Sequence, residues 1–365
     1  MKECRVKDIC IKGSSNLKQK DVEGKKGLYP VYGASGIISS IDTYHQENEY
    51  IAIVKDGSGI GRVSFMPPKS SVIGTMQYIL PKEGYDIRYI GYCLQSLGLN
   101  KYKQGAAIPH IYFRDYGERN IIVTDNINEQ RRIVSYLDSS FKLIDEIKNK
   151  ALKSLTEAKA LFQSALAEAM EPKEGWEEKT LGELCSIIGG GTPSKKNSSY
   201  YNGDIPWATV SDMNCDYLQN TICKISDDGV KNSSTQIISK NEVIIATRVG
   251  LGKVCILCQD TAINQDLKGI IPKSDNKLIR KFIFWWFRSK SNYIVSNGVG
   301  ATVKGVKLSF VSNLKISLPT ISTQKQIVSR LDKLSSKVRA IEEKYQKMVE
   351  ECDALKQAML RDVFE

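Results

Sequence analysis

Apolar residues recur at steps of three and four positions in two stretches of the chain, residues 127–171 and 321–365. This spacing predicts one long helix with an apolar stripe in each stretch, as is typical of a coiled coil. Neither stretch contains Pro or Gly. We expect the stripes to pair with each other, because an isolated amphipathic helix is only marginally stable in water. The residues assigned to this pairing are Leu137, Ile144, Ile147, Leu155, Leu331, Val338, Ile341, Val349 and Leu355.

The two stretches are copies of each other at a constant offset of 194 residues, and 16 of the 45 aligned positions are identical. Each copy follows a globular stretch of similar size. The expected organisation is a first globular domain in residues 1–126, a first long helix in 127–175, a second globular domain in 176–320 and a second long helix in 321–365. A pseudo-twofold relation between the copies would make the helices antiparallel and place the two heads at opposite ends.

The globular stretches, which we call the heads, are predicted to mix strands and helices. Short β-rich runs at residues 50–54, 72–80, 242–247 and 314–318 alternate with Gly-rich turns. One helix per head is expected near residues 87–97 and 277–289. The heads share short motifs in the same order, such as Gly59-Ile60-Gly61 and Gly250-Leu251-Gly252. The expected fold class is therefore α+β, with two mixed heads, two long antiparallel helices and an internal pseudo-twofold repeat.

The excess positive charge of the chain lies in the heads. Residues 1–126 carry 17 basic against 13 acidic side chains, and residues 176–320 carry 18 against 12. A basic head is expected where a protein meets a polyanion. No apolar run reaches the length of a membrane span, and the nine scattered cysteines do not suggest a disulfide framework. We therefore expect a cytoplasmic protein that does not interact with membranes.

Motifs for catalysis and metal binding are incomplete in this sequence. Gly250-Leu251-Gly252-Lys253 lacks the Ser or Thr that follows the Lys of a phosphate loop, and we expect a tight turn there instead. Cys255 and Cys258 have no further pair of soft ligands to complete a zinc site. With two histidines and no convergent nucleophile, the chain is expected to be non-catalytic, without a metal or cofactor of its own.

Polar loops are the candidate binding surfaces of the heads. Residues 189–201 are flexible, basic and aromatic, and residues 28–36 occupy the corresponding place in the first head, where residues 104–114 are a second candidate surface. Lys and small hydroxyl side chains reach DNA phosphates, whereas planar amides and carboxylates recognise base edges. An ordinary solvated loop is the alternative interpretation. The candidate DNA-binding residues are Lys25, Lys26, Tyr32, Arg62, Lys103, His110, Thr192, Lys195, Lys196, Tyr200, Ser211, Asp212, Arg248 and Lys304.

The duplicated, ordered motifs resemble the specificity (S) subunit of type I restriction–modification systems over essentially the whole chain. The similarity rests on Gly191-Thr192-Pro193, on Pro206-Trp207, and on residues 128–134 and 324–328, where the helices begin. The first head departs from the pattern, because it has Tyr29-Pro30-Val31-Tyr32-Gly33 in place of the Gly-Thr-Pro segment. Heads that differ at this loop favour an asymmetric DNA site.

The resemblance implies two target-recognition domains, each of which recognises one half of a split site in double-stranded DNA. The helices would set the distance between the half-sites and dock two methyltransferase (modification) subunits, which restriction subunits would join. S-adenosylmethionine, and ATP and Mg for restriction, would belong to those partner subunits. Two other interpretations remain: a free-standing DNA-binding or architectural protein, and a coiled-coil scaffold whose heads bind protein or sugar.

Overall fold

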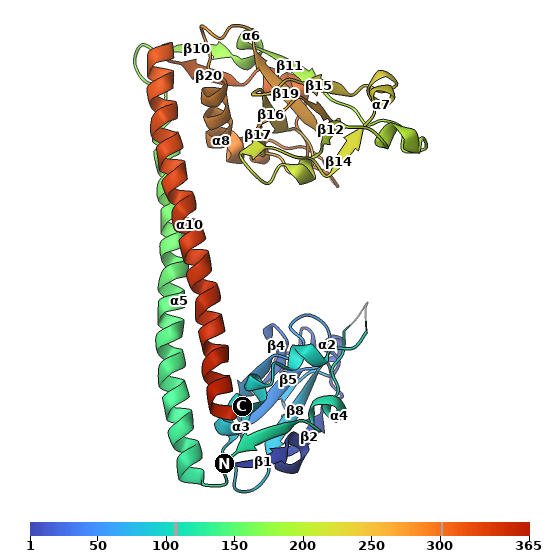
Figure 1. Ribbon diagram of the computed structural model, residues 1–365, viewed down its shortest axis with the longest axis vertical. Helices are drawn as coiled ribbons and strands as arrows, with labels where there is room; N and C mark the ends of the chain where they lie inside the picture. The colour runs from blue at the N-terminus through green and yellow to red at the C-terminus, as the bar shows by residue number, and fades with distance from the viewer. Residues whose placement is uncertain (106–108, 301) are drawn as a thin grey trace. The chain divides into compact units, whose positions relative to one another are not determined.

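The computed structural model describes residues 1–105, 109–300 and 302–365. Contacts divide the chain into two compact units, which are formed by residues 1–153 with 344–365 and by residues 154–343. Each unit contains one head and part of each long helix, coloured green and red in Figure 1. The division therefore passes through both helices. Each helix packs on one head with its first part and on the other head with its last part.

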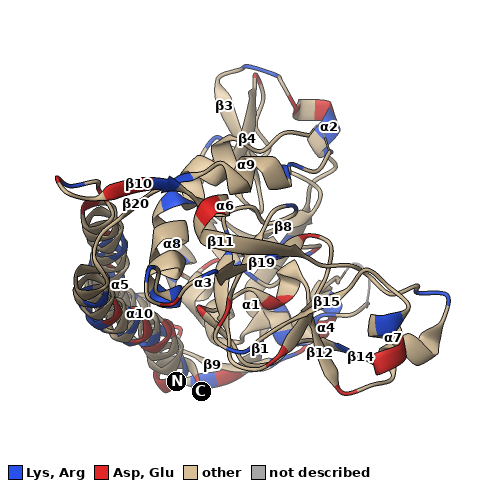
Figure 2. Cartoon of the chain, turned by 90° about the horizontal axis from the view of Figure 1, so that it is seen from above, with Lys and Arg blue, Asp and Glu red and all other residues tan. Residues whose placement is uncertain are grey.

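The two predicted long helices are present as α5 (Ile127–Ala169) and α10 (Ile321–Phe364). The side chain of Asn126 caps α5, since its Oδ1 accepts a hydrogen bond from the backbone N–H of Asn128 at 3.0 Å. Thr320 caps α10 through its Oγ1, which accepts from the N–H of Thr323 at 3.3 Å. Basic and acidic residues both occur along the two helices (Figure 2), and most of these charged side chains are exposed.

Within each unit the two helices pack antiparallel. In the first unit, Lys148 contacts Asp353 and Lys356 contacts Asp145, each at 2.6 Å. In the second unit, Lys159 contacts Glu342 at 3.5 Å. The buried or half-buried residues of the predicted stripe are Leu137, Ile144, Leu155, Leu331, Val338 and Val349.

Three residues assigned to helix pairing are exposed, and this part of the prediction is wrong. The exposed fractions are 50% for Ile147, 36% for Ile341 and 52% for Leu355. Their positions fit a step of three or four, but the helix carries a second stripe about a quarter turn away from the first. Conversely, Phe141, Ile327 and Val363, which are not among the assigned pairing residues, pack against the cores of their own units.

The first head is built around an antiparallel sheet in the order β2-β8-β5-β6, with a smaller sheet in the order β4-β3-β7. The strands β1 and β9 pair at the base of the head. The predicted strand at residues 72–80 is in fact two strands, which the turn around Gly74 separates. The elements are β1 (Lys2–Arg5), α1 (Val6–Ile9), β2 (Cys10–Ser14), α2 (Gln19–Val22), β3 (Tyr29–Gly33), β4 (Gly36–Ile41), β5 (Tyr50–Val54), β6 (Val63–Met66), β7 (Ser71–Val72), β8 (Met76–Pro81), α3 (Ile87–Ser96), η1 (Leu99–Tyr102), α4 (Phe113–Tyr116) and β9 (Asn120–Val123).

The second head repeats this plan with more strands. One sheet has the order β11-β19-β16-β17-β13 and another the order β14-β12-β18-β15, while β10 and β20 pair at the base. The predicted helix at residues 277–289 begins later and extends further, as α8. The elements are β10 (Glu177–Thr180), α6 (Leu181–Leu184), β11 (Cys185–Gly189), η2 (Ser198–Tyr201), β12 (Ile205–Ala208), η3 (Val210–Asp212), β13 (Tyr217–Leu218), β14 (Cys223–Ile225), α7 (Asp227–Lys231), β15 (Gln236–Ile238), β16 (Val243–Ala246), β17 (Val254–Leu257), β18 (Thr261–Ile263), β19 (Leu267–Pro272), α8 (Arg280–Ser296), α9 (Leu308–Ser312) and β20 (Lys315–Leu318).

Two side chains on each long helix attach the head to it, and they are identical in both copies. Gln130 and Gln324 are fully buried. The Oε1 of Gln130 accepts from the N–H of Asp86 at 2.7 Å, and the Oε1 of Gln324 accepts from the N–H of Ile279 at 2.9 Å. Both Nε2 groups donate to backbone carbonyl groups of the head and of the residues before the helix.

An aspartate two turns later makes the second attachment. Asp138 accepts hydrogen bonds from Arg88 at 2.6 Å and from the hydroxyl of Tyr92. Asp332 accepts from Lys281 at 2.8 Å and from the indole N–H of Trp285 at 3.0 Å. Burial, with the bond to Asp138, raises the pKa of Tyr92 to about 12. A cation and an aromatic donor thus perform the same role in both units.

Replacing Gln324 with Ala is expected to lower the free energy of unfolding by about 2–4 kcal/mol, because it leaves one N–H and two carbonyl groups buried without their partner. Gln130→Ala should have a similar effect. Urea unfolding measures both. Gln326→Ala, at an exposed position of α10, is the control and should change stability by less than about 0.5 kcal/mol. Equal stability of the Gln324 and Gln326 variants would contradict the attachment.

Candidate nucleic-acid interface

Each head brings together two loops that are distant in sequence, and it uses the same backbone contacts. In the first head, Asp56 and His110 form an antiparallel bridge. In the second head, Arg248 and Gly305 form the same bridge. We call residues 55–62, 104–105 and 109–110 the first loop surface, and residues 247–253, 299–300 and 302–305 the second loop surface. Residues 106–108, part of a predicted binding surface, lie outside the described residues.

The side chains at this shared bridge differ between the heads. The Nδ1 of His110 lies 2.7 Å from Oδ1 of Asp56, so the imidazole is held by a carboxylate, as expected for a structural histidine. At the equivalent place, Nη1 of Arg248 lies 3.7 Å from Oδ1 of Asp266, and Arg248 is exposed. The same backbone frame therefore presents a histidine–aspartate pair in one head and an arginine in the other.

Several of the predicted residues lie at the first loop surface. Arg62 donates a hydrogen bond to the carbonyl oxygen of Ala34, which joins the turn after β3 to this surface. Lys103 is exposed beside it, and Tyr32 is half-buried just before the turn. Lys25 and Lys26 are exposed but precede β3, at the opposite end of that strand. The structure does not group these two lysines with Arg62.

The glycine-rich segment of the second head is connected to the second loop surface. The N–H of Gly191 donates to the carbonyl of Ile263 at 3.0 Å, and the hydroxyl of Thr192 bonds to the side chain of Gln265. The N–H of Thr247 donates to the carbonyl of Asp266 at 2.8 Å. Residues 264–266 thus link Thr192 with Arg248, and Lys304 is exposed at the far loop.

A cavity of about 860 Å³ opens at this segment. Its aromatic wall is Tyr201 and Trp207, whose rings pack edge to face at 5.9 Å. The indole N–H of Trp207 donates to the carbonyl of Gly191 at 3.2 Å. The lining includes Thr192, Lys195, Ser198 and Tyr201 of the predicted loop at residues 189–201, and also Trp207, Thr209, Asn264 and Gln265, which were not among the candidate residues. Adjacent planar amides such as Asn264 and Gln265 were the available signal, because amides recognise base edges.

Other candidates of the second head have different roles. Both carboxylate oxygens of Asp212 accept internal hydrogen bonds, from the N–H of Thr209 at 2.8 Å and that of Ile222 at 2.7 Å, so this side chain shapes a turn. Ser211 and Lys196 are exposed, and Tyr200 is half-buried against α7. Burial lowers the pKa of the neighbouring Lys268, and the charge of Asp266 opposes this shift.

The paired glycine motifs form tight turns, in agreement with their interpretation from sequence. Gly61 has a φ of 82° and Gly252 a φ of 85°. A Cβ at Gly61 would lie 2.4 Å from the backbone nitrogen of Asn100, and one at Gly252 would lie 2.3 Å from Oγ of Ser291. Both positions therefore require glycine, for conformational and steric reasons. The close contact of Gly61 is with η1 in the first head, and that of Gly252 is with α8 in the second head.

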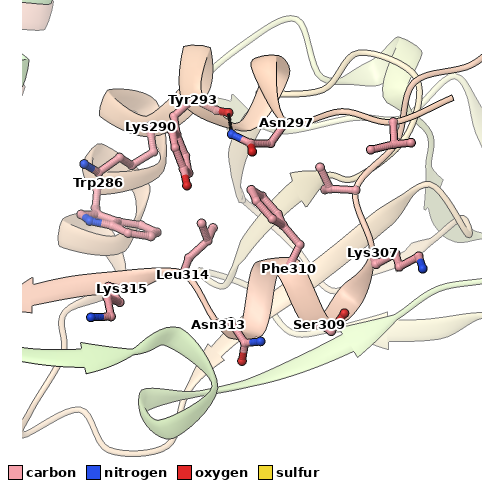
Figure 3. Close-up of a pocket in the computed structure, with 13 residues that line it drawn as sticks. Trp286, Lys290, Tyr293, Asn297, Lys307, Ser309, Phe310, Asn313, Leu314 and Lys315 are labelled. Carbon is pink, nitrogen blue, oxygen red and sulfur yellow. Dashed lines mark hydrogen bonds between the residues drawn. The ribbon is translucent and has the colours of Figure 1, made fainter.

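A second cavity, of about 690 Å³, lies between α8 and α9, and its lining includes residues 299 and 305–307. Figure 3 shows Tyr293 and Phe310 inside it with Lys290, Lys307 and Lys315 around them. The two rings are nearly parallel, with centroids 6.2 Å apart. The lining of this cavity thus combines two aromatic rings with three lysines.

The thiols and carboxylates of the described residues do not form a metal site. No group of three or more His, Cys, Asp and Glu side chains in residues 1–105, 109–300 and 302–365 is placed to hold a metal ion. Cys255 is fully buried in the core of the second head, and this burial raises the pKa of its thiol to about 12. In the same part of the chain, no helix has the length and apolar character required to cross a membrane.

A family model for the type I restriction modification DNA specificity domain matches residues 1–157 and 173–351. The chain is 28% identical over 271 residues to the specificity subunit of the type I restriction enzyme EcoR124I/EcoR124II from Escherichia coli, which covers 70% of this chain and 65% of the relative. It is 30% identical over 165 residues to the MjaIX specificity subunit from Methanocaldococcus jannaschii, which covers 44% and 38%. The aligned segments thus span less than two thirds of either relative.

The fold has a match over its whole length. A chain from a structure that concerns complex assembly and conformational transition of the type I R-M system superposes with a TM-score of 0.77. The match covers 98% of this chain and 96% of that chain at 18% sequence identity. At this identity the match concerns the fold.

Proposed function

Because this chain belongs to the family of type I restriction modification DNA specificity domains, we propose that it is the DNA-recognising subunit of a type I restriction–modification complex. Each loop surface contacts one half of a bipartite site in double-stranded DNA. Exposed Lys195, Lys196 and Lys304 contact phosphates, and amide and guanidinium groups of the second head contact base edges.

The observation that carries this proposal is the shared backbone bridge with different side chains. The bridge between Asp56 and His110 in the first head is equivalent to the bridge between Arg248 and Gly305 in the second head. A glutamine and an aspartate at equivalent positions of the two long helices hold each head to its helix. Two heads in equivalent positions with different surfaces suit two different half-sites. The proposed DNA site is therefore asymmetric, and its bases are divided between the heads.

A repeated apolar patch supports the docking of two modification subunits. Ile147 and Leu355 are exposed in the first unit, and their repeat equivalents Ile341 and Leu161 are exposed in the second. Ile147 lies nine residues after Asp138, or about two and a half helical turns, so it faces away from the head. Each patch is free to bury its apolar surface against a partner.

We assign no chemical step to this chain in the proposed complex. Methyl transfer from S-adenosylmethionine belongs to the modification subunits, and ATP and Mg belong to restriction subunits that join them. The contribution of this chain is to place those subunits on one DNA sequence.

The double variant Lys195→Ala with Lys196→Ala should weaken binding to all DNA sequences alike. Each lost phosphate contact should lower the slope of log K against log salt by about 0.9. Binding is measured by fluorescence anisotropy between roughly 50 and 200 mM salt. Lys240→Ala, at an exposed position of the same head, is the control. An unchanged slope would place the DNA elsewhere, and binding without salt dependence would contradict the proposed function.

A further inference from the structure

We propose that charges along the contact between α5 and α10, which we call the seam, make these two helices pair with each other. The same charges disfavour pairing of α5 with α5, or of α10 with α10, of a second molecule. The proposal does not depend on DNA binding. It starts from the ion pairs across the seam, Lys148–Asp353 and Asp145–Lys356 in the first unit and Lys159–Glu342 in the second. In each pair the two residue numbers add up to 501, so a single antiparallel register describes both units.

The 194-residue offset relates these positions to one another. Lys148 of α5 aligns with Glu342 of α10, and Lys159 of α5 aligns with Asp353 of α10. The charge at each aligned position is thus opposite in the two copies. Asp145 and Arg339 are a third aligned pair of opposite charge.

Part of the apolar stripe cannot make this distinction. Val134, Leu137 and Leu166 are buried in α5, and their equivalents Val328, Leu331 and Leu360 in α10 are the same residue types and are also buried. A helix copy could therefore pack its stripe against another molecule of itself. At these positions, discrimination between the two kinds of pair must come from the flanking side chains.

Pairing of like helices in the same register brings like charges together. Two α5 helices would place Lys148 opposite Lys159 of the second molecule, and would do so twice by symmetry. Two α10 helices would place Glu342 opposite Asp353 and Arg339 opposite Lys356, again twice. In the mixed pair of α5 with α10, Lys148 and Lys159 instead contact the oppositely charged Asp353 and Glu342. The seam thus accepts the other copy and disfavours a second molecule of the same helix.

The test uses the whole protein after a site-specific protease cuts it in the exposed turn at residues 171–175. The two fragments, which differ in mass, are unfolded in urea and refolded together. Native mass spectrometry then measures the mixed pair and both like pairs. For the wild-type sequence we expect the mixed pair to dominate far beyond the statistical proportion.

Lys159→Glu with Glu342→Lys keeps the ion pair across the mixed seam but makes positions 148 and 159 attract in a like pair, and likewise 342 and 353. The ratio of the squared mixed population to the product of the like populations should fall about sixteenfold, since four exposed pairs each contribute a factor of about two. Adding Lys148→Asp with Asp353→Lys restores like-charge repulsion in both like pairs. The ratio should then return to that of the wild type.

The fourfold variant has the same amino-acid charges as the wild type in exchanged places, which separates the seam effect from net charge and stability. An equal ratio for the wild type and the first double variant would overturn the proposal. A fourfold variant that stays at the level of the double variant would overturn it as well.

Discussion

Replacing residues 176–318 with the second head of another family member should change one half of the methylated DNA site and leave the other half unchanged. Each mismatched base pair typically costs about 1–3 kcal/mol, so three altered positions would reduce recognition of the old site by roughly a hundredfold or more. The exchange keeps Gln324 and Asp332, because both lie on α10. Methylome sequencing of a host that carries the variant and its modification subunit gives the result.

The design of this exchange follows from the attachment of the head. The incoming head must supply a cation and an aromatic donor for Asp332, as Lys281 and Trp285 do here. Since Arg88 and Tyr92 serve Asp138 in the first head, either combination should be accepted. The reciprocal exchange of residues 1–126 is the matched control and should change the opposite half. A change in both halves after one exchange would refute the assignment of one head to one half-site.

Introducing charge into one apolar patch should remove one of two modification subunits. Leu161→Glu with Ile341→Glu places two carboxylates on the patch of the second unit, where docking would have to bury them without a partner. We expect affinity at that site to fall by at least about a hundredfold, which corresponds to roughly 3 kcal/mol. Light scattering at saturation should then give one modification subunit per chain, where the wild type binds two.

The duplicated patch supplies its own comparison. Ile147→Glu with Leu355→Glu should remove the other subunit, and all four changes together should prevent binding. Ala340→Glu is the control, because it adds a charge at an exposed position of α10 next to the patch. All these residues are exposed, so the fold should be preserved, as circular dichroism can verify. Full binding of two subunits by the fourfold variant would show that the patches are not the docking surface.

The sequence was sufficient for the elements that depend on local periodicity. The start of both long helices, the strand at Tyr50–Val54 and the turns at Gly61 and Gly252 follow from spacing and from backbone conformation. The repeat also indicated which residues have equivalents, including Gln130 with Gln324. It did not indicate what these glutamines contact, because their partners are backbone groups of the head, which have no signature in sequence.

Periodicity misplaced the faces of the long helices for a physical reason. A helix with apolar residues on two neighbouring faces offers more than one stripe with steps of three and four, and the pattern alone does not say which is buried. Packing decides this: Phe141 is covered by its own unit, whereas Ile147 and Leu355 are left exposed. Because packing leaves Ile147, Ile341 and Leu355 exposed, these three predicted pairing residues become candidates for partner binding.

For the binding surface, the sequence by itself determined the chemical character of the loop. The tertiary structure decided which side chains come together in that surface. Composition marked Thr192 and Lys195 because basic, hydroxyl-rich loops suit phosphates. Only folding brought Gln265 and Arg248 to the same place and held Asp212 in internal hydrogen bonds. The reason is that a loop's chemistry is local in sequence, whereas the contacts that leave a side chain free or satisfied come from segments far along the chain.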